Sequence, residues 1–346
     1  MANQIHNINV IAKETLPSPK TIKAILPLTQ SARETVINSR NALVSILDRK
    51  DKRLIVVVGP CSIHDIDAAQ DYAGRLKDLA GDLSDVFHIL MRVYFEKPRT
   101  TVGWKGYLYD PYLNDSYKIN TGIQSARNLL RNITDLQVPC STEHVDTITP
   151  QYFGDLLTWA AIGARTTESQ IHREMASGLS TPVGFKNGTG GSISIAANAV
   201  KAASSSHTFM GCNSKGYICS VKTKGNQHCH IILRGGSDGP NYDKVEEAKS
   251  LLDTNKSIFI DLSHANSLKQ HKRQLIVCKE VAEQIGKGET SIHGVMIESN
   301  LVEGAQKKPT VYGKSITDAC IGLEDTETLL DMLSDAVRKR NSIRRS

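Results

Sequence analysis

The sequence predicts an α/β protein built on a (β/α)8 barrel, the TIM-barrel fold, with an N-terminal extension and an inserted β-hairpin. From residue 54 onward, eight short apolar runs alternate with amphipathic helical patterns, as parallel strands covered by helices do. Eight such units over this length indicate a closed barrel. No GxGxxG motif follows the first run, which disfavours an open dinucleotide-binding sheet.

The chain divides into an N-terminal extension, residues 1–50, and a catalytic barrel, residues 51–346. Three prolines break residues 1–28 into short extended pieces. Ser31 and Glu34 then form a capping-box pattern, which predicts that a helix begins there. This extension either packs on its own barrel or reaches a neighbouring subunit.

The barrel strands are predicted from continuous apolar runs that each end on a polar residue. They cover residues 54–61, 88–94, 138–143, 160–165, 182–186, 228–234, 257–264 and 293–299. Two insertions interrupt the alternation. A long loop, about residues 95–118, follows the second strand, and residues 209–224 predict a hairpin before the sixth strand.

Composition narrows the cellular setting. The net charge of +6 is modest, and 40% of residues are hydrophobic, as in ordinary globular proteins. The seven cysteines include no CxxC pair, which favours free thiols in the cytoplasm. Neither a signal peptide nor a membrane span is predicted. The basic tail, residues 338–345, lacks interleaved aromatic residues, so we expect a solvated end and no nucleic-acid partner.

Every predicted strand ends on, or just before, a group that can bind an anion or a metal, at the barrel end where active sites lie. In strand order these groups are Cys61, Arg92 with Lys97 and Arg99, Glu143, Arg165, Lys186, Arg234, His264 and Glu298. The basic members would repel one another by about 4 kcal/mol per pair at ~4 Å. We therefore expect more than one anionic group to bind there, on one substrate or on two.

The remaining strand-end residues predict a metal site. Cys61, His264 and Glu298 supply sulfur, nitrogen and oxygen, and Asp318, after the last strand, completes the set. These mixed donors favour Mn²⁺, Fe²⁺, Co²⁺ or Zn²⁺ over Mg²⁺ or Ca²⁺. Taken singly, Cys61 is more often a buried small hydrophobe and His264 a core histidine. Strands one, seven and eight are neighbours in a closed barrel, which favours the ligand interpretation.

Longer motifs carry a resemblance to a known family. They are GPCSIHD (59–65), MRVYFEKPRTTVGWKG (91–106), GARTTESQIHREMASGLS (163–180), GFKNGT (184–189), ILRGG (232–236), SHAN (263–266), IESN (297–300) and SITDAC (315–320). Together they resemble the 3-deoxy-D-arabino-heptulosonate 7-phosphate (DAHP) synthases, in the class I type of enteric bacteria and yeast. The resemblance implies condensation of phosphoenolpyruvate with D-erythrose 4-phosphate, the first step of the shikimate pathway.

The resemblance also assigns roles to site residues. Arg92 and Lys186 would bind the phosphoenolpyruvate carboxylate, and Arg165 and Arg234 its phosphate, with Lys97 nearby. Arg99 and Thr100 would bind the phosphate of erythrose 4-phosphate, and Glu143, Ala164 and Asp318 would line the substrate site. The metal ligands would be Cys61, His264, Glu298 and Asp318. Lys97, Cys61 and His264 would be the catalytic set.

Lys97 has two open roles. It could transfer a proton to the new alkoxide or orient the aldehyde, because it is flanked by cations that should lower its pKa. It could equally act only by neutralising charge.

Two departures from the family pattern are visible. Gly190 stands where the family usually has an acidic residue. The segment between Glu298 and Asp318 is shortened.

Family members are usually inhibited by an aromatic amino acid, in a cleft formed partly by the hairpin and by the N-terminal arm of another subunit. The resemblance therefore implies a homo-oligomer, dimer or tetramer. The corresponding positions are Pro150, Gln151, Met175, Leu179, Ser180, Phe209, Gly211 and Val221. Gly211 favours tyrosine as the inhibitor, and ordinary core or dimer packing is the alternative for each position.

Three other functions remain open at this point. A related synthase would use another aldose phosphate, arabinose 5-phosphate, in place of erythrose 4-phosphate. A Schiff-base aldolase would use Lys97 or Lys186 and need no metal. A catalytically inactive barrel would serve as a regulatory protein.

Overall fold

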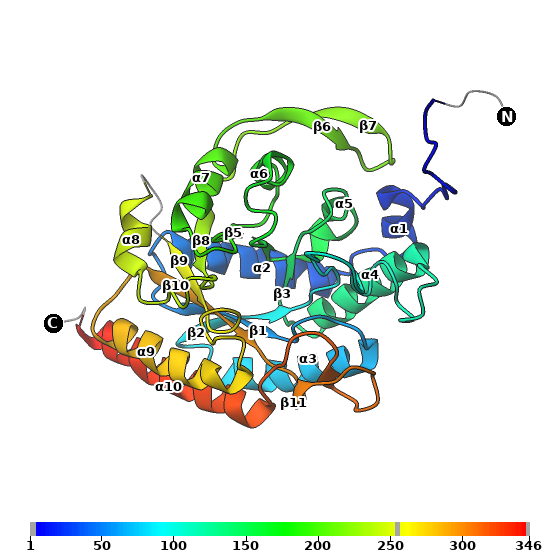
Figure 1. The fold of residues 1–346 in the computed structure, drawn as a ribbon. Helices are drawn as coiled ribbons and strands as arrows, with labels where there is room; N and C mark the ends of the chain where they lie inside the picture. Colours follow the sequence, from blue (N-terminus) through cyan, green and yellow to red (C-terminus); the bar gives the residue numbers. More distant parts are fainter. Residues whose placement is uncertain (1–4, 253–256, 344–346) are drawn as a thin grey trace.

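Eight parallel strands close into a barrel in the computed structural model, which describes residues 5–252 and 257–343 (Figure 1). In order around the barrel they are β1 (Leu54–Gly59), β2 (Phe87–Arg92), β3 (Cys140–Glu143), β4 (Trp159–Ile162), β5 (Val183–Lys186), β8 (Cys229–Leu233), β9 (Ile258–Asp261) and β10 (Ile292–Glu298). The predicted fold is therefore confirmed, and each strand falls at its expected apolar run. Arg344 and Arg345 of the basic tail lie outside the described residues.

Helices cover the outside of the barrel. They are α3 (Ile66–Asp82), α4 (Ile119–Asp135), α5 (Pro150–Phe153) with the 3-10 turn η1 (Gly154–Leu156), α6 (Gln170–Ser177), α7 (Ile193–Ala203), α8 (Val245–Ser250), η2 (His271–Arg273), α9 (Gln274–Gly286) and α10 (Leu323–Ile343). The Asp65 side chain caps α3 by accepting from the Asp67 and Ala68 amides, the usual partner of a free helix N-terminus. No described helix is long and apolar enough to cross a membrane.

The barrel interior is packed with side chains. Alternate strand residues point inward, among them Ile55 and Val57 of β1, while Val56 and Val58 face the helices. The Trp159 and Phe259 rings stack inside with centroids 5.5 Å apart. Gly294 is required beside them, because a Cβ there would lie 2.6 Å from the Phe259 ring. This core gives the strand ends a rigid support.

The N-terminal extension contains two helices, α1 (Pro19–Ile25) and α2 (Gln30–Leu47). Helix α1 lies within residues 1–28, where only short extended pieces were expected. The capping-box prediction was wrong, because Thr29 caps α2, accepting from the Ala32 amide at 3.1 Å. The Thr29 hydroxyl also donates to Asp135 of α4, so a tertiary contact sets where the helix begins.

Helix α2 closes the amino end of the barrel, where the strands begin. Its residues Leu43, Ile46 and Leu47 belong to the same buried cluster as the inward-facing strand residues. Tyr94, two residues beyond the end of β2, belongs to that cluster at the opposite, carboxyl end.

The inserted hairpin consists of β6 (Thr208–Cys212) and β7 (Ile218–Lys222), slightly earlier than the predicted residues 209–224. It reaches from α7 across α6 toward α1 (Figure 1). The Ser214 carbonyl at its tip accepts from the Lys20 amide at 2.7 Å. The hairpin therefore joins the barrel to the N-terminal extension.

A small parallel ladder, β11 (Val302–Ala305) with β12 (Lys314–Ser315), forms the segment between Glu298 and Asp318. Gln306 stabilises this segment by hydrogen bonds within it. Its Nε2 donates to the Val311 and Lys314 carbonyls at 2.8 and 2.9 Å, and its Oε1 accepts from the Val311 amide at 2.9 Å.

Candidate active site and metal centre

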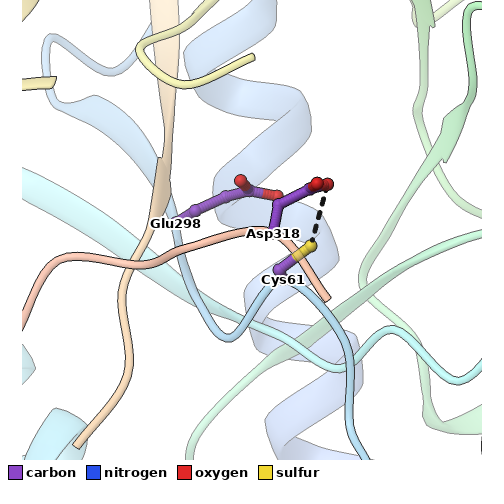
Figure 2. Close-up of side chains that lie close together, drawn as sticks. All are labelled: Cys61, Glu298 and Asp318. Carbon is purple, nitrogen blue, oxygen red and sulfur yellow. Dashed lines mark hydrogen bonds between the residues drawn. The ribbon is translucent and has the colours of Figure 1, made fainter. Parts of the chain in front are cut away.

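Three of the four predicted metal ligands converge at the carboxyl end of the barrel. Ligand atoms of Cys61, Glu298 and Asp318 all lie within 4.8 Å of one another (Figure 2). Cys61 follows β1 and Glu298 ends β10, and these strands pair directly. Asp318 reaches them from the loop that follows β12. The Cys61 thiol donates to Asp318 Oδ2 at 3.4 Å.

The fourth predicted ligand, His264, lies at the edge of this group. Its Nε2 is 3.7 Å from Glu298 Oε1, while its Nδ1 is 2.8 Å from Asp261 Oδ2. Its backbone has a φ of 53°, an uncommon value for a residue other than glycine. A carboxylate behind a histidine fixes the ring orientation and leaves the other nitrogen free for a metal.

The donor set fits a divalent cation. One sulfur, one imidazole nitrogen and carboxylate oxygens are ligands that first-row ions accept. Burial, and after it the nearby Glu298 carboxylate, raise the pKa of the Cys61 thiol to about 12. Binding a cation there would displace the thiol proton and neutralise the crowded carboxylates.

Lys97 contacts this group directly. Its Nζ donates to Cys61 Sγ at 3.1 Å and lies 3.9 Å from Asp318 Oδ2. The expectation of a lowered pKa was wrong. Burial alone would lower the pKa of Lys97, but Cys61, Asp318 and Glu298 outweigh burial and raise it. The neighbours of Lys97 in space are acidic, although Arg99 lies only two residues away along the chain.

Arg92 and Lys186 are buried cations that carboxylates already pair. Arg92 Nη2 donates to Glu298 Oε1 at 3.1 Å, and both side chains are 1% exposed. Lys186 Nζ lies 3.1 Å from Glu143 and 3.7 Å from Asp261. Protein carboxylates thus relieve part of the repulsion that the sequence predicted.

Gly163 makes room for the Glu143 carboxylate. A Cβ at Gly163 would lie 2.4 Å from Glu143 Oε1. The Glu143 side chain is buried, and burial alone would raise its pKa. The charge of Lys186 opposes burial, and the pKa of Glu143 is lowered. Glu143 is therefore a fixed negative group beside Lys186.

Arg165 and Arg234 form the unpaired cationic part of the site. In the described part of the chain, neither guanidinium forms a salt bridge. Burial lowers the pKa of Arg234, and the charge of Arg165 lowers it further. Arg165 Nε donates to Thr100 Oγ1 at 2.8 Å, which joins the loops after β4 and β2. Ala164 lies half-buried beside Arg165. Two neighbouring cations that form no salt bridge among the described residues favour an anion between them.

Arg99 lies in the loop after β2, two residues beyond Lys97. It is exposed, and its Nε donates to the Trp104 carbonyl within its own loop at 2.8 Å.

Sequence reasoning missed Asp261 and three buried asparagines. Asp261 contacts both Lys186 and His264, and its position inside an otherwise apolar strand was the available signal. Asn187 accepts from the Arg234 amide at 2.8 Å. Asn241 donates to Asn187 and accepts from Gly235 N, and Asn266 accepts from the Asn241 amide. This network ties the ends of β5, β8 and β9 together.

The predicted regulatory residues lie away from the strand ends, on the side covered by the hairpin (Figure 1). They come from α5 (Pro150, Gln151), α6 and the loop after it (Met175, Leu179, Ser180), and the hairpin (Phe209, Gly211, Val221). Phe209 and Val221 are cross-strand partners. A Cβ at Gly211 would lie 2.8 Å from Val221 Cγ2.

One buried carboxylate links α5 to the active site. Glu96 accepts from the Asp146 amide at 2.9 Å and from the Thr149 hydroxyl at 3.0 Å. Thr149 immediately precedes α5, and Glu96 immediately precedes Lys97.

A barrel with paired and unpaired cations beside a metal-binding group at its strand ends belongs to the enzymes that use a divalent metal on anionic substrates. The particular family follows from comparison with known proteins. The model of the DAHP synthetase I family matches residues 28–331, and the chain belongs to this family.

Known proteins are similar in sequence to this chain over nearly its whole length. It is 53% identical to "Phospho-2-dehydro-3-deoxyheptonate aldolase, Phe-sensitive" from Escherichia coli (strain K12), covering 95% of this chain and 96% of that protein. It is 48% identical to the Trp-sensitive protein of the same strain, covering 98% and 99%. The solved structure of the aldolase from Francisella tularensis SCHU S4 superposes with a TM-score of 0.94 at 47% identity, covering 96% and 99%.

Proposed function

We propose that the chain condenses phosphoenolpyruvate with D-erythrose 4-phosphate and water, giving DAHP and phosphate. This reaction opens the shikimate pathway of aromatic amino acid biosynthesis. The observation that carries the proposal is the convergence of buried Arg92 and Lys186, unpaired Arg165 and Arg234, and the Cys61 group at one barrel mouth. Family membership supports it independently.

Phosphoenolpyruvate binds through two pairs of cations in this proposal. Arg92 and Lys186 hold its carboxylate, while Glu143 keeps Lys186 in place. Arg165 and Arg234 hold its phosphate, beside Ala164. Arginine forks suit phosphate and carboxylate because they form two parallel hydrogen bonds.

The aldose phosphate binds at the rim. Arg99 and Thr100 hold the phosphate of erythrose 4-phosphate, which leaves the aldehyde directed toward Lys97 and Asp318. Because Arg99 is exposed, it meets the phosphate without the cost of a buried unpaired charge.

Cys61, His264, Glu298 and Asp318 would hold a divalent cation, and Mn²⁺, Fe²⁺, Co²⁺ and Zn²⁺ all suit their donors. When bound, such an ion supplies Lewis-acid polarisation of the aldehyde oxygen. Asp261 keeps His264 Nε2 turned toward Glu298.

The bond-forming steps then follow from the positions of the side chains. C3 of phosphoenolpyruvate attacks the aldehyde carbon, and Lys97 Nζ donates a proton to the new alkoxide. Water adds at C2, and phosphate leaves into the cationic site of Arg165 and Arg234. Their charge stabilises the departing anion.

Regulation and assembly extend the proposal. An aromatic amino acid, tyrosine by the presence of Gly211, binds among the hairpin, α5 and α6. Exposed apolar residues on the arm (Ile8, Ile11) and on the hairpin (Met210, Ile218) support a homo-oligomer, dimer or tetramer. All seven cysteines are free thiols, which supports a cytoplasmic location.

The deciding experiment measures phosphate release from phosphoenolpyruvate with and without erythrose 4-phosphate, in metal-stripped and metal-restored protein. We expect release only with both erythrose 4-phosphate and metal. Release without erythrose 4-phosphate would overturn the assignment. Faster turnover with arabinose 5-phosphate would favour the related synthase, and full activity in excess chelator would favour a Schiff-base aldolase.

A further inference from the structure

A buried tyrosine, whose hydroxyl has no hydrogen-bond partner among the described residues, lies against Arg92, one of the two cations proposed to bind the phosphoenolpyruvate carboxylate. The Tyr94 side chain is 2% exposed, and its hydroxyl has no partner in the part of the chain that the structure describes. Leaving a buried hydroxyl unpaired costs free energy. A sequence that keeps tyrosine here, where phenylalanine would pack as well, indicates a ligand for the hydroxyl.

Arg92 lies directly against this residue. Its guanidinium carbon is 4.0 Å from the centroid of the Tyr94 ring, a cation–π contact that fixes the guanidinium over the ring. Arg92 Nη2 is occupied by Glu298, while its Nη1 is buried and unpartnered among the described residues. Two buried donors without acceptors therefore lie together.

The charged groups that shift the pKa of Tyr94 show which side chains lie near its hydroxyl. Burial raises its pKa, Arg92 lowers it, and Glu143, Asp261 and Glu298 raise it again. Glu143 and Asp261 are the two partners of Lys186, and Glu298 is the partner of Arg92. The hydroxyl thus lies near Arg92 and near the carboxylates that pair with Arg92 and Lys186, and it is protonated, so that it can donate.

We propose that Tyr94 is a substrate-binding residue whose hydroxyl donates a hydrogen bond to a carboxylate oxygen of phosphoenolpyruvate, beside Arg92 and Lys186. This inference rests on the proposed function. A carboxylate has about four lone-pair sites and accommodates three donors. The third donor distinguishes a planar carboxylate from a second phosphate, because a neutral hydroxyl adds direction to the site without adding charge.

The test is Tyr94→Phe, which keeps the ring under Arg92 and removes only the hydroxyl. Phosphoenolpyruvate binding is measured by calorimetry on the metal-loaded protein without erythrose 4-phosphate, and the KM for each substrate is measured separately. We expect phosphoenolpyruvate binding to weaken about tenfold or more, as for loss of one hydrogen bond to a charged acceptor. The KM for erythrose 4-phosphate should not rise, and the melting temperature should not fall. Phosphoenolpyruvate affinity within twofold of the wild type would overturn the inference.

Tyr72→Phe is the matched control. Tyr72 is equally buried, but its hydroxyl donates to Ser299 Oγ at 2.9 Å outside the barrel. This variant should melt at a lower temperature and bind phosphoenolpyruvate as the wild type does. Equal weakening in both variants would overturn the role of Tyr94. A wild type that binds phosphoenolpyruvate but releases no phosphate with erythrose 4-phosphate would overturn the proposed reaction, while the calorimetry would still decide on Tyr94.

Discussion

Lys97 Nζ donates a hydrogen bond to Cys61 Sγ over 3.1 Å. The proposed proton donor therefore touches a proposed metal ligand. One ammonium group both faces the substrate and offsets the negative charge that collects around the sulfur.

Replacing Lys97 with methionine keeps most of the side-chain volume and removes the charge and the proton. We expect kcat to fall by about 10²- to 10⁴-fold, the range for loss of a general acid. Steady-state kinetics with a direct assay of bound metal would separate this loss from loss of the ion. Lys105→Met, in the same loop, is the control and should stay within about twofold. A Lys97→Met enzyme that keeps a tenth of its turnover would exclude the proton-donor role.

Cys61→Ala should abolish metal binding and lower activity by at least about 100-fold, because the sulfur ligand is lost. Cys140→Ala is the matched control, since Cys140 is also fully buried but lies within β3. It should lose some stability through the small cavity and keep both metal and activity. Elemental analysis and melting curves would distinguish the two variants. Metal content equal in both would count against Cys61 as a ligand.

Asp261→Asn preserves shape and removes the charge that orients His264 and pairs with Lys186. We expect metal affinity to fall by about 10- to 100-fold, as for other groups that orient a ligand. Phosphoenolpyruvate binding should weaken as well. Metal titrations would measure the first effect, with exposed Asp85→Asn as a control expected to match the wild type. Unchanged metal affinity would mean that Asp261 serves only Lys186.

Glu96 should make stability depend on pH. Burial, then the charge of Asp146, raises its pKa from 4.5 to about 8 in the folded protein. The folded state therefore holds a proton that the unfolded chain releases, and its stabilising effect is lost as pH rises from about 5 to 8. The wild type should lose stability relative to Glu96→Gln over this range. The free energy of unfolding is measured by denaturation at several pH values. If it changes with pH equally in both proteins, the raised pKa of Glu96 is contradicted.

Gly211→Ser should weaken inhibition by tyrosine, because the added Cβ meets Val221 Cγ2 at 2.8 Å and displaces it. Activity without inhibitor should stay near that of the wild type, since the hairpin lies outside the barrel, over α6 (Figure 1). Assays with each aromatic amino acid would test this. Inhibition of the wild type by phenylalanine alone would rule out tyrosine as its regulator.

The barrel strands were predictable because buried parallel strands are continuous apolar runs, and this signal is local. The start of α2 was not, because the bond from Thr29 to Asp135 joins residues far apart in sequence. Helix α1 was missed because prolines suggested extended chain, although Pro19 stands at its first turn, where proline is tolerated.

The strand-end residues could be listed from sequence because the barrel brings all strand ends to one mouth. Their pairing could not be predicted. Cys61, Asp318 and Glu298, which raise the pKa of Lys97, come from distant parts of the chain, so the direction of this shift required the structure. The asparagine network was hidden for a similar reason, since each member acts on the backbone of a distant loop.

Helix α2 sits beneath the same interior cluster that Tyr94 covers at the opposite end. Helix α2 therefore sets a limit for shortening the N-terminus to test the proposed inhibition by an aromatic amino acid. Deletions that stop before Thr29 would remove the arm and α1, whose Lys20 amide donates to the Ser214 carbonyl at the hairpin tip, and would leave α2 in place under the barrel. Longer deletions would expose Leu43 and Ile46 to water and loosen the support of the site above.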